Sequence, residues 1–282
     1  MKKILGLVAS QRKLANGEIL TKEVAAAAGD DCQLELLRLA DMRLDPCRGC
    51  YACLTPGKQC PLDDDLYFLA EKIKAADGII LSAPCYVLGP AAVTKVLGDR
   101  MIALAQLIED FWGKPCVVIA TAGIEGWEGY TVSALNTMVR FMGFTLKDSH
   151  MFMGALPGEG ILGEGALERA RKMGEALFGE ARQVRTGECP TCWSEIWKFP
   201  EPSSAVCPIC GQRVSLEVGE AGITWIYGDS PKMFDKEHLK EHFQGWLRGK
   251  VQEFVSRRKE LAVVRERYKG KDTWLIPSRE VK

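Results

Sequence analysis

The sequence of 282 residues has no apolar run approaching the roughly 20 residues that a helix needs to cross a bilayer. It also has no net charge, because 37 Lys and Arg residues balance 37 Asp and Glu residues, and it has only three histidines. Hydrophobic residues make up 47% of the chain, which excludes a mostly disordered protein. We therefore expect a globular protein without a membrane span.

The first residues combine two lysines with a short apolar run, as a signal peptide does. The run stops at Gln11, Arg12 and Lys13, where a secreted protein would need its cleavage site. We interpret the segment as a first β-strand and expect a cytoplasmic protein.

Cysteine, in contrast, is abundant, with eleven residues. Eight of them form two tight clusters, which in a reducing cytoplasm indicate metal binding rather than disulfides. The other three lie in apolar stretches, where we expect small buried hydrophobic side chains. These three are Cys32, Cys85 and Cys116.

The second cluster consists of two C-x2-C knuckles that are separated by 14 residues, each with Pro after its first cysteine: Cys189, Cys192, Cys207 and Cys210. This spacing predicts a tetrahedral site of four thiolates, with residues 193–206 forming a short hairpin that carries the second knuckle. A zinc ion there would be structural, because four protein thiolates leave no open position. A single iron would make the site an electron relay, and the spacing does not separate the two metals.

The first cluster lies in one loop over residues 47–60 and consists of Cys47, Cys50, Cys53 and Cys60. Cysteines at i, i+3 and i+6, with a later Cys-Pro, follow the spacing of bacterial ferredoxins. Three such closely spaced ligands are unusual for zinc. The pattern favours a [4Fe-4S] cluster, and a loop that is empty or only partly loaded is the alternative.

Short apolar runs alternate with helical patterns over the first 180 residues. The expected strands are 3–9, 34–39, 78–82, 115–120 and 144–153, and the expected helices are 18–28, 63–76, 90–107, 130–142 and 164–182. This alternation predicts an α/β fold with a flavodoxin-like, five-stranded, doubly wound parallel sheet. Ligands of such sheets bind at the carboxyl ends of the strands.

Three loops follow strands at that edge. Residues 10–18 offer hydroxyl and basic side chains at a helix N-terminus, which suits a phosphate. Residues 83–90 offer an aromatic side chain and a Gly-flanked backbone to a flat ligand. Residues 121–129 are rich in Gly, so their amides can approach the edge of a ring.

Residues 1–180 resemble the NADPH-dependent FMN reductase superfamily, and specifically the iron-sulfur flavoproteins of anaerobes. The resemblance rests on the loop 9–18, the compact cysteine loop with the aspartates 63–65 after it, Pro84-x-Tyr86 with Lys95, Asp99 and Arg100, and the Gly-rich loop that follows 113–115. Gln11 replaces the family's usual Pro, and Gly17 stands where a hydroxyl residue usually contacts the phosphate, although its amide can still donate.

The resemblance implies FMN and a homodimer or homotetramer. It implies that the phosphate side is formed by Ser10, Arg12, Lys13, Asn16, Gly17 and Glu18. It implies that the ring side is formed by Pro84, Cys85, Tyr86, Val87, Leu88, Gly89, Thr121, Ala122, Gly123 and Gly126. It assigns no side chain as a general acid or base, since the cofactors carry the chemistry.

The resemblance ends before the last hundred residues. We expect a flavodoxin-like domain over 1–184, a four-cysteine zinc-ribbon or rubredoxin-like module over 185–218, and a C-terminal helical extension over 219–282. Within this extension, a strand at 223–227 is expected before an amphipathic helix. The helix carries apolar residues at helical spacing: Leu239, Phe243, Trp246, Leu247, Val251, Phe254 and Val255. This stripe predicts packing, either on the first domain or on a neighbouring subunit.

Three functions are compatible with these features. The leading one is an enzyme, a redox flavoprotein that transfers electrons between a [4Fe-4S] cluster and FMN to an unidentified acceptor, fed by a small molecule or a protein donor such as ferredoxin. The second is a direct NAD(P)H-dependent FMN or quinone reductase without a cluster. The third is a redox-sensing adaptor that binds nucleic acid or protein through the ribbon and the basic helix.

The charge distribution bears on the third function. From 232 to 282 there are 14 basic and 8 acidic residues, which would suit an acidic partner. The ribbon, however, carries Glu195, Glu201 and Glu217 and no basic cluster interleaved with aromatics, so nucleic acid is disfavoured.

Overall fold

The computed structural model describes residues 1–220 and 222–270. The first part of the chain forms a parallel sheet with the strand order β2-β1-β3-β5-β6, in which β4 adds a short antiparallel pairing to the end of β3. The strands are β1 (Lys2–Val8), β2 (Cys32–Arg38), β3 (Gly78–Tyr86), β4 (Gly89–Pro90), β5 (Pro115–Ala122) and β6 (Thr145–Met153). The flavodoxin-like sheet predicted from the sequence is confirmed.

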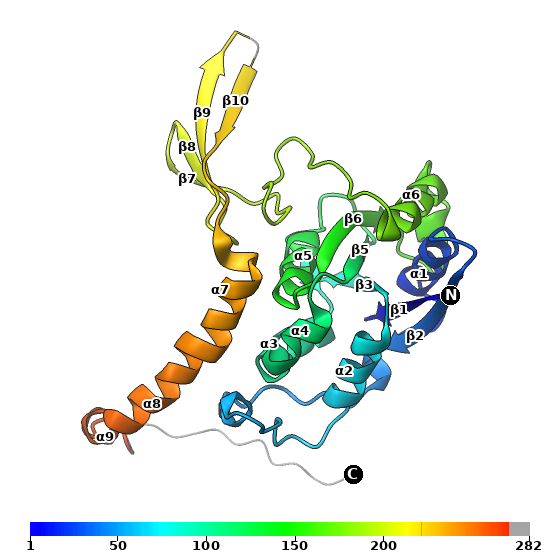
Figure 1. The fold of residues 1–282 in the computed structure, drawn as a ribbon. Coiled ribbons are helices and arrows are strands. Elements are labelled where there is room, and N and C mark those ends of the chain that lie inside the picture. Colours follow the sequence, from blue (N-terminus) through cyan, green and yellow to red (C-terminus); the bar gives the residue numbers. More distant parts are fainter. Residues whose placement is uncertain (221, 271–282) are drawn as a thin grey trace.

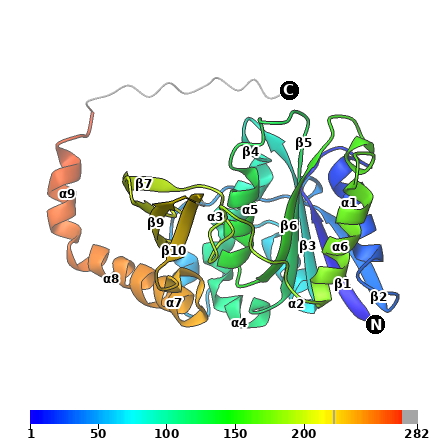
Figure 2. The same ribbon diagram turned by 90° about the horizontal axis from the view of Figure 1, so that it is seen from above.

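Helices cover both faces of this sheet (Figure 2). One hydrophobic core joins the sheet to α1 (Asn16–Ala26) and α6 (Ala166–Phe178). The other core joins it to α2 (Leu66–Ala75), α3 (Ala92–Leu104) and α5 (Thr131–Phe141), with the short α4 (Ile108–Phe111) at the same side. The central strands β3 and β5 are buried over nearly their whole length, because helices exclude water from both faces. The short 3-10 turns are η1 (Leu39–Asp41), η2 (Ala52–Leu54), η3 (Ala105–Leu107), η4 (Glu159–Ile161) and η5 (Lys232–Phe234).

A second, antiparallel sheet follows, with the order β10-β9-β8-β7. Its strands are β7 (Lys198–Glu201), β8 (Ser204–Val206), β9 (Arg213–Gly219) and β10 (Gly222–Tyr227). The hairpin expected between the knuckles is β7–β8, and the strand expected at 223–227 is β10. The β9–β10 hairpin projects away from the flavodoxin-like part (Figure 1).

The C-terminal segment forms α7 (Lys236–Lys240), a π-helical segment η6 (Glu241–Leu247), α8 (Arg248–Ser256) and α9 (Arg258–Glu266). Its first half packs on the flavodoxin-like part, where Leu239, Phe243 and Leu247 share a core with side chains that include Leu54 and Ile108. Trp246, on the outer side of η6, is exposed, and so are apolar side chains of the second half such as Phe254 and Val255. The stripe predicted from the sequence is therefore divided between the chain's own core and the surface.

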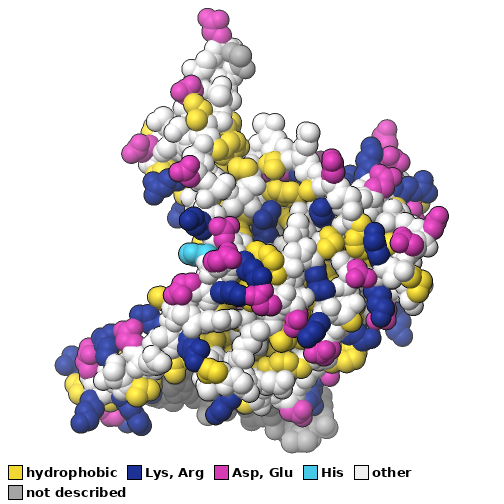
Figure 3. All heavy atoms as spheres, viewed as in Figure 1, with side chains coloured by type: hydrophobic (Ala, Val, Ile, Leu, Met, Phe, Trp, Pro, Cys, Tyr) yellow, Lys and Arg dark blue, Asp and Glu magenta, His cyan; other side chains and the backbone are white. Residues whose placement is uncertain are grey.

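No described helix is both long and apolar enough to cross a membrane. On the face shown in Figure 3, basic and acidic side chains are interspersed. Between α8 and α9, for example, Arg257 forms ion pairs with both Glu253 of α8 and Glu260 of α9. The positive surplus of the C-terminal segment is thus partly neutralised over the residues that the structure describes, and residues 271–282 lie outside them.

The loop after β1 is held by one buried carboxylate, that of Glu18 in the first turn of α1. Its oxygens accept hydrogen bonds from Lys22 Nζ at 2.7 Å, Leu14 N at 2.9 Å and Arg38 Nη2 at 2.8 Å. Arg38 Nη1 in turn donates to the carbonyl of Arg12 at 2.7 Å. The Lys22 hydrogen bond is the largest cause that lowers the pKa of Glu18, from 4.5 to about 2. The loop therefore depends on the ionised form of this side chain.

A pH series on Glu18→Gln tests this dependence. Since the folded pKa lies below the unfolded one, the charge of Glu18 stabilises the fold fully above pH 4.5 and loses this effect as the pH falls toward about 2. The wild type should exceed the variant in free energy of unfolding by about 1–3 kcal/mol near neutral pH. This gap should narrow below pH 4.5 in urea unfolding experiments. Glu164→Gln, at an exposed position, should show no such gap, and a gap for Glu18→Gln that stays constant with pH would contradict the account.

Candidate functional site

The predicted phosphate loop lies at the N-terminus of α1, where the helix has no side-chain cap. Amides in such a first turn are free to bind an anion. Ser10 beside them is 4% exposed. Ser82, in the middle of β3 and beside the last residue of β1, has a buried hydroxyl without a hydrogen-bond partner among the described residues. This hydroxyl lies 3.1 Å from where a Cβ on Gly17 would be. The first-turn amides and the Ser82 hydroxyl are thus available as hydrogen-bond donors to an anion. A larger residue at position 17 would reduce the space beside them.

The other predicted phosphate residues divide into two groups. Arg12 and Lys13 are exposed at the rim of the loop. The side chain of Asn16 is engaged elsewhere, because its Nδ2 donates to the carbonyl of Gly154 at 2.8 Å and its Oδ1 accepts from Gly160 N at 3.1 Å. Asn16 and Glu18 therefore position the phosphate loop through their side chains, against the loop after β6 and against Arg38.

The predicted ring loop after β3 is a two-residue turn between Tyr86 and Gly89. Both central residues are left-handed, with φ of 51° at Val87 and 62° at Leu88, a conformation that a β-branched side chain strongly disfavours. Val87 is 97% exposed, so its own packing does not compensate for the strain. Strained and exposed turns of this kind gather at ligand sites.

The loop after β5 holds this turn in place. Tyr130 N donates to the carbonyl of Leu88 at 2.9 Å, and a Cβ on Gly129 would lie 2.0 Å from the same oxygen. Only Gly at position 129 permits this approach. The sulfur of Cys85 lies 3.4 Å from the carbonyl of Trp127, which ties the two loops together a second time.

Among the predicted ring residues on β5 and after it, Thr121 and Ala122 are buried at the strand end, whereas Gly123 and Gly126 are exposed in the loop. Pro84 lies at the end of β3, in register with Thr121. The topology thus brings the three predicted loops to one sheet edge. The expectation of three buried isolated cysteines was correct for Cys116 but wrong for Cys32 and Cys85, which are only partly buried.

The compact cysteine loop directs its four cysteines to one pocket. Cys47, Cys50, Cys53 and Cys60 all line it, with Arg100 and apolar side chains completing the wall. Burial raises the pKa of the Cys53 thiol to about 11, and the neighbouring thiol of Cys60 acts in the same direction. These four sulfurs lie farther apart than the four sulfurs of the second cluster. Among the described residues, only the second cluster has metal-ligating atoms that all lie within 4.8 Å of one another.

Arg100 of α3 fixes both ends of this loop. Its guanidinium is 1% exposed, forms a buried ion pair with Asp64, and donates to the carbonyl of Asp45 at 2.7 Å. It also reaches the sulfur of Cys60 at 3.5 Å. Burial opposes the charge of Asp64, but the hydrogen bond from Arg100 outweighs it, so the pKa of this carboxyl lies below its usual range. The middle of the loop is held by Gln106 Nε2, which donates to the carbonyl of Cys53 at 2.5 Å.

The donors of this pocket fit an anionic iron–sulfur cluster. Four cysteines in one loop supply the thiolates, and a buried cation beside Cys60 offsets negative charge. The apolar wall around Leu62 and Ile102 would restrict solvent at such a centre.

The second cluster brings its four sulfurs within 4.8 Å of one another, as its spacing predicts. Cys189 and Cys210 have their sulfurs 3.5 Å apart, and so do Cys192 and Cys207. Four thiolates around one metal at about 2.3 Å stand about 3.8 Å apart, so the donor set fits zinc or iron. All four cysteines are buried.

The two knuckles repeat one backbone pattern. Cys189 O accepts from Trp193 N at 2.8 Å, and Cys207 O accepts from Gly211 N at 2.9 Å. Trp193 and Gly211 occupy equivalent left-handed positions, with φ of 59° and 82°. Gly is the residue that such a position favours, so a Trp there indicates that its side chain is needed.

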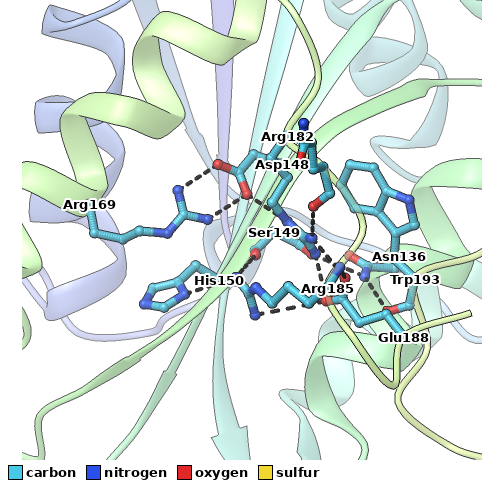
Figure 4. Close-up of polar contacts among 10 residues, drawn as sticks. Asn136, Asp148, Ser149, His150, Arg169, Arg182, Arg185, Glu188 and Trp193 are labelled. Atoms are coloured by element: carbon cyan, nitrogen blue, oxygen red, sulfur yellow. Dashed lines mark hydrogen bonds and ion pairs between the residues drawn. The ribbon is translucent and has the colours of Figure 1, made fainter. Parts of the chain in front are cut away.

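Trp193 attaches the four-cysteine module to the flavodoxin-like part (Figure 4). Its side chain is 5% exposed and belongs to the main core. Its carbonyl accepts from Asn136 Nδ2 at 3.4 Å, and the guanidinium of Arg182 lies 4.3 Å from its ring. Arg182 also forms an ion pair with Glu188 at 2.7 Å and another with Asp148 at 3.0 Å. The module therefore packs against the flavodoxin-like part through side-chain contacts, and is not joined to it by the chain alone.

One further cation faces the four-cysteine site. Arg140 of α5 lies between the rings of Trp193 and Phe234, at 5.9 Å and 5.8 Å, and its buried Nε has no hydrogen-bond partner among the described residues. Burial lowers the pKa of this guanidinium, while the thiol of Cys192 acts in the opposite direction. A divalent metal with four thiolates is a dianion, which this cation would offset.

Sequence reasoning did not assign roles to Arg100, Ser82, Tyr130, Arg140 or Trp193. Two features of the sequence hint at such roles: Arg100 is a charged residue inside the apolar pattern of α3, and Trp193 stands where the second knuckle has Gly211. The partners of both residues are distant in sequence.

A family model described as NADPH-dependent FMN reductase matches residues 2–155. An iron-sulfur flavoprotein of Methanocaldococcus jannaschii is 41% identical over 99 residues, which cover 35% of this chain and 51% of that protein. The chain therefore spans about half the length of this relative.

Two similarities extend further along the chain. A flavone synthase of Aspergillus candidus is 26% identical over 254 residues, 78% of each protein. A solved structure of a flavone reductase covers 98% of this chain and 100% of its own, with a TM-score of 0.68 at 19% identity, which shows a shared fold. The sheet, its loops and the family match over more than half of the sequence lead to one conclusion: the chain belongs to the NADPH-dependent FMN reductase family.

Proposed function

We propose that this protein transfers electrons between a [4Fe-4S] cluster in the 47–60 loop and FMN at the sheet edge, and passes them to an organic acceptor. The observation that carries the proposal is the convergence of four cysteines on one pocket beside the buried Arg100. The iron-sulfur flavoproteins among the relatives support it.

FMN would be held by the residues of the three loops. The uncapped first turn of α1 would bind the phosphate through its amides, with Ser10 and Ser82 as hydroxyl donors and Arg12 and Lys13 at the rim. The Tyr86–Gly89 turn and the amides of Gly123 and Gly126 would border the ring. Bound FMN supplies one- and two-electron chemistry, so no side chain is required as a general base.

The cluster would be bound by the thiolates of Cys47, Cys50, Cys53 and Cys60. Arg100 would hold the loop closed through Asp64 and the carbonyl of Asp45, and would present its charge to Cys60. Bound there, the cluster supplies single electrons.

The four-cysteine module would bind zinc as a structural ion. Its four thiolates are buried and leave no position for a substrate, and the module is docked through Trp193. A single iron in the same site is the alternative and would make it a second redox centre.

We further propose a division into the flavodoxin-like domain over 1–184, the four-cysteine module over 185–218 and the extension over 219–282. A homodimer or homotetramer in the cytoplasm, with a small-molecule or ferredoxin-type donor, completes the proposal. The exposed apolar side chains of α8, such as Phe254 and Val255, support a subunit contact.

A second candidate is direct reduction by NAD(P)H without a cluster, and the description of the matching family favours it. It requires no iron in the 47–60 loop. Metal and sulfide analysis of the wild type beside Cys50→Ala separates the two functions, because only a cluster-bearing wild type loses iron in the variant.

After anaerobic purification, Cys50→Ala should lose most of its iron and acid-labile sulfide, from about four of each per chain, because removal of one thiolate ligand destabilises the bound cubane. FMN content should be unchanged, since position 50 lies outside the three loops at the sheet edge. Cys32→Ala serves as the matched control and should retain both cofactors. Wild-type iron and sulfide in Cys50→Ala would show that the cluster ligands are assigned wrongly.

Cys207→Ser tests the four-cysteine module separately. Removing one of four thiolates should eliminate most of the bound zinc and open the segment 185–228 to limited proteolysis, because metal binding and folding of such modules are coupled. The visible flavin spectrum should persist. Loss of flavin together with zinc would contradict the separate roles of the two parts, and Cys32→Ser should change neither.

A further inference from the structure

A cavity with a volume of about 680 Å³ lies between α3, α5 and the four-cysteine module. Cavities of about 300–1,000 Å³ accommodate small organic ligands. The four-cysteine module contributes Ile196 and, from its second knuckle, Ile209, while η6 contributes Phe243. The opposite walls are mainly apolar side chains such as Met138 and Phe141.

Two hydroxyl groups on α5 and just before it are uncommitted in this cavity. Ser133 is 6% exposed, lines the cavity, and its hydroxyl has no hydrogen-bond partner among the described residues. The hydroxyl of Tyr130 likewise has no partner within that part of the chain. The one ammonium group on the wall, that of Lys95, is paired with Asp99. The cavity therefore offers hydrogen-bond donors to a neutral oxygen and no unpaired cation to a phosphate.

The cavity also adjoins the ring loops. Pro90 and Tyr130 line one end of it. The backbone of Tyr130 bonds to the carbonyl of Leu88, and its hydroxyl lies 2.8 Å from where a Cβ on Gly89 would be. A ligand in the cavity would thus lie beside the loop that is proposed to border the flavin.

We propose that this cavity binds the organic electron acceptor, a flat and mostly apolar molecule with a carbonyl oxygen that accepts from Ser133 or Tyr130. The assignment as acceptor rests on the proposed function, whereas the binding of such a molecule does not. The four-cysteine module acquires a second role, since its knuckle forms one wall of the binding site.

The test uses the full-length oxidised protein and isothermal titration with 2-methyl-1,4-naphthoquinone, with no reductant present. Ile209→Trp fills the cavity and should weaken binding at least about tenfold. The matched control is Ile223→Trp on β10, where the side chain is 59% exposed and does not line the cavity, and it should bind as the wild type does.

A second pair of variants keeps the test informative if Ile209→Trp disturbs the knuckle. Ser133→Val should weaken binding about fivefold through loss of one hydrogen bond, and Ser133→Thr should retain it. Zinc, iron and FMN are measured in the same samples, so loss of the proposed redox function is recognised separately from loss of quinone binding.

Three outcomes would overturn the inference. The first is no binding by the wild type up to about 1 mM. The second is equal affinity in the wild type and in both Ile209→Trp and Ser133→Val. The third is displacement of the quinone by NADP+, the oxidised nucleotide, which would make the cavity a nucleotide site.

Discussion

The buried ion pair between Arg100 and Asp64 controls the geometry of the cysteine loop. Both side chains are essentially inaccessible to solvent, so each requires the other, and removing one partner of such a pair typically costs about 3–5 kcal/mol. Arg100 belongs to α3, whereas Asp64 and the carbonyl of Asp45 lie at the two ends of the loop. One side chain thus closes a long loop on a rigid helix. The four cysteines converge on one pocket because of this closure.

The same helix connects the other parts of the protein. Its Lys95 and Met101 face the cavity that the four-cysteine module completes, and Gln106 just after it holds the carbonyl of Cys53. Trp193 anchors the module in the core to which α3 and α5 contribute. A metal in the four-cysteine site would therefore stabilise the cavity as well as the ribbon. Ile209 can form part of the cavity wall only while the second knuckle is folded.

The sequence allowed prediction of features that depend on local pattern. The five strands of the parallel sheet are continuous apolar runs, and the spacing of the two C-x2-C knuckles identified a site whose sulfurs the structure brings together. The three loops were placed at one edge because parallel strands end there together. Element boundaries shifted by a few residues, as at α1, which begins at Asn16 where Glu18 accepts from Leu14 N.

Features that depend on contacts between distant residues could not be predicted. Asn16 was expected at the phosphate, but its amide bonds to backbone 138 and 144 residues away. The turn at Val87 and Leu88 is left-handed although neither position holds Gly or Asn, the residues that usually indicate such a turn. It also depends on Gly129, because a side chain there would collide with the carbonyl of Leu88. The cavity requires side chains from α3, α5, the ribbon and η6 at once, and no sequence window contains them all.

The central claim is that the 47–60 loop and the sheet edge carry two redox groups that exchange electrons. The most direct measurement is an anaerobic reductive titration of the full-length protein, followed by visible absorption and by electron paramagnetic resonance at low temperature. The account predicts that flavin bleaching is accompanied by the signal of a reduced [4Fe-4S] cluster, and that Cys50→Ala abolishes this signal but retains the bleaching. Complete flavin reduction in the iron-loaded wild type without any cluster signal would contradict it.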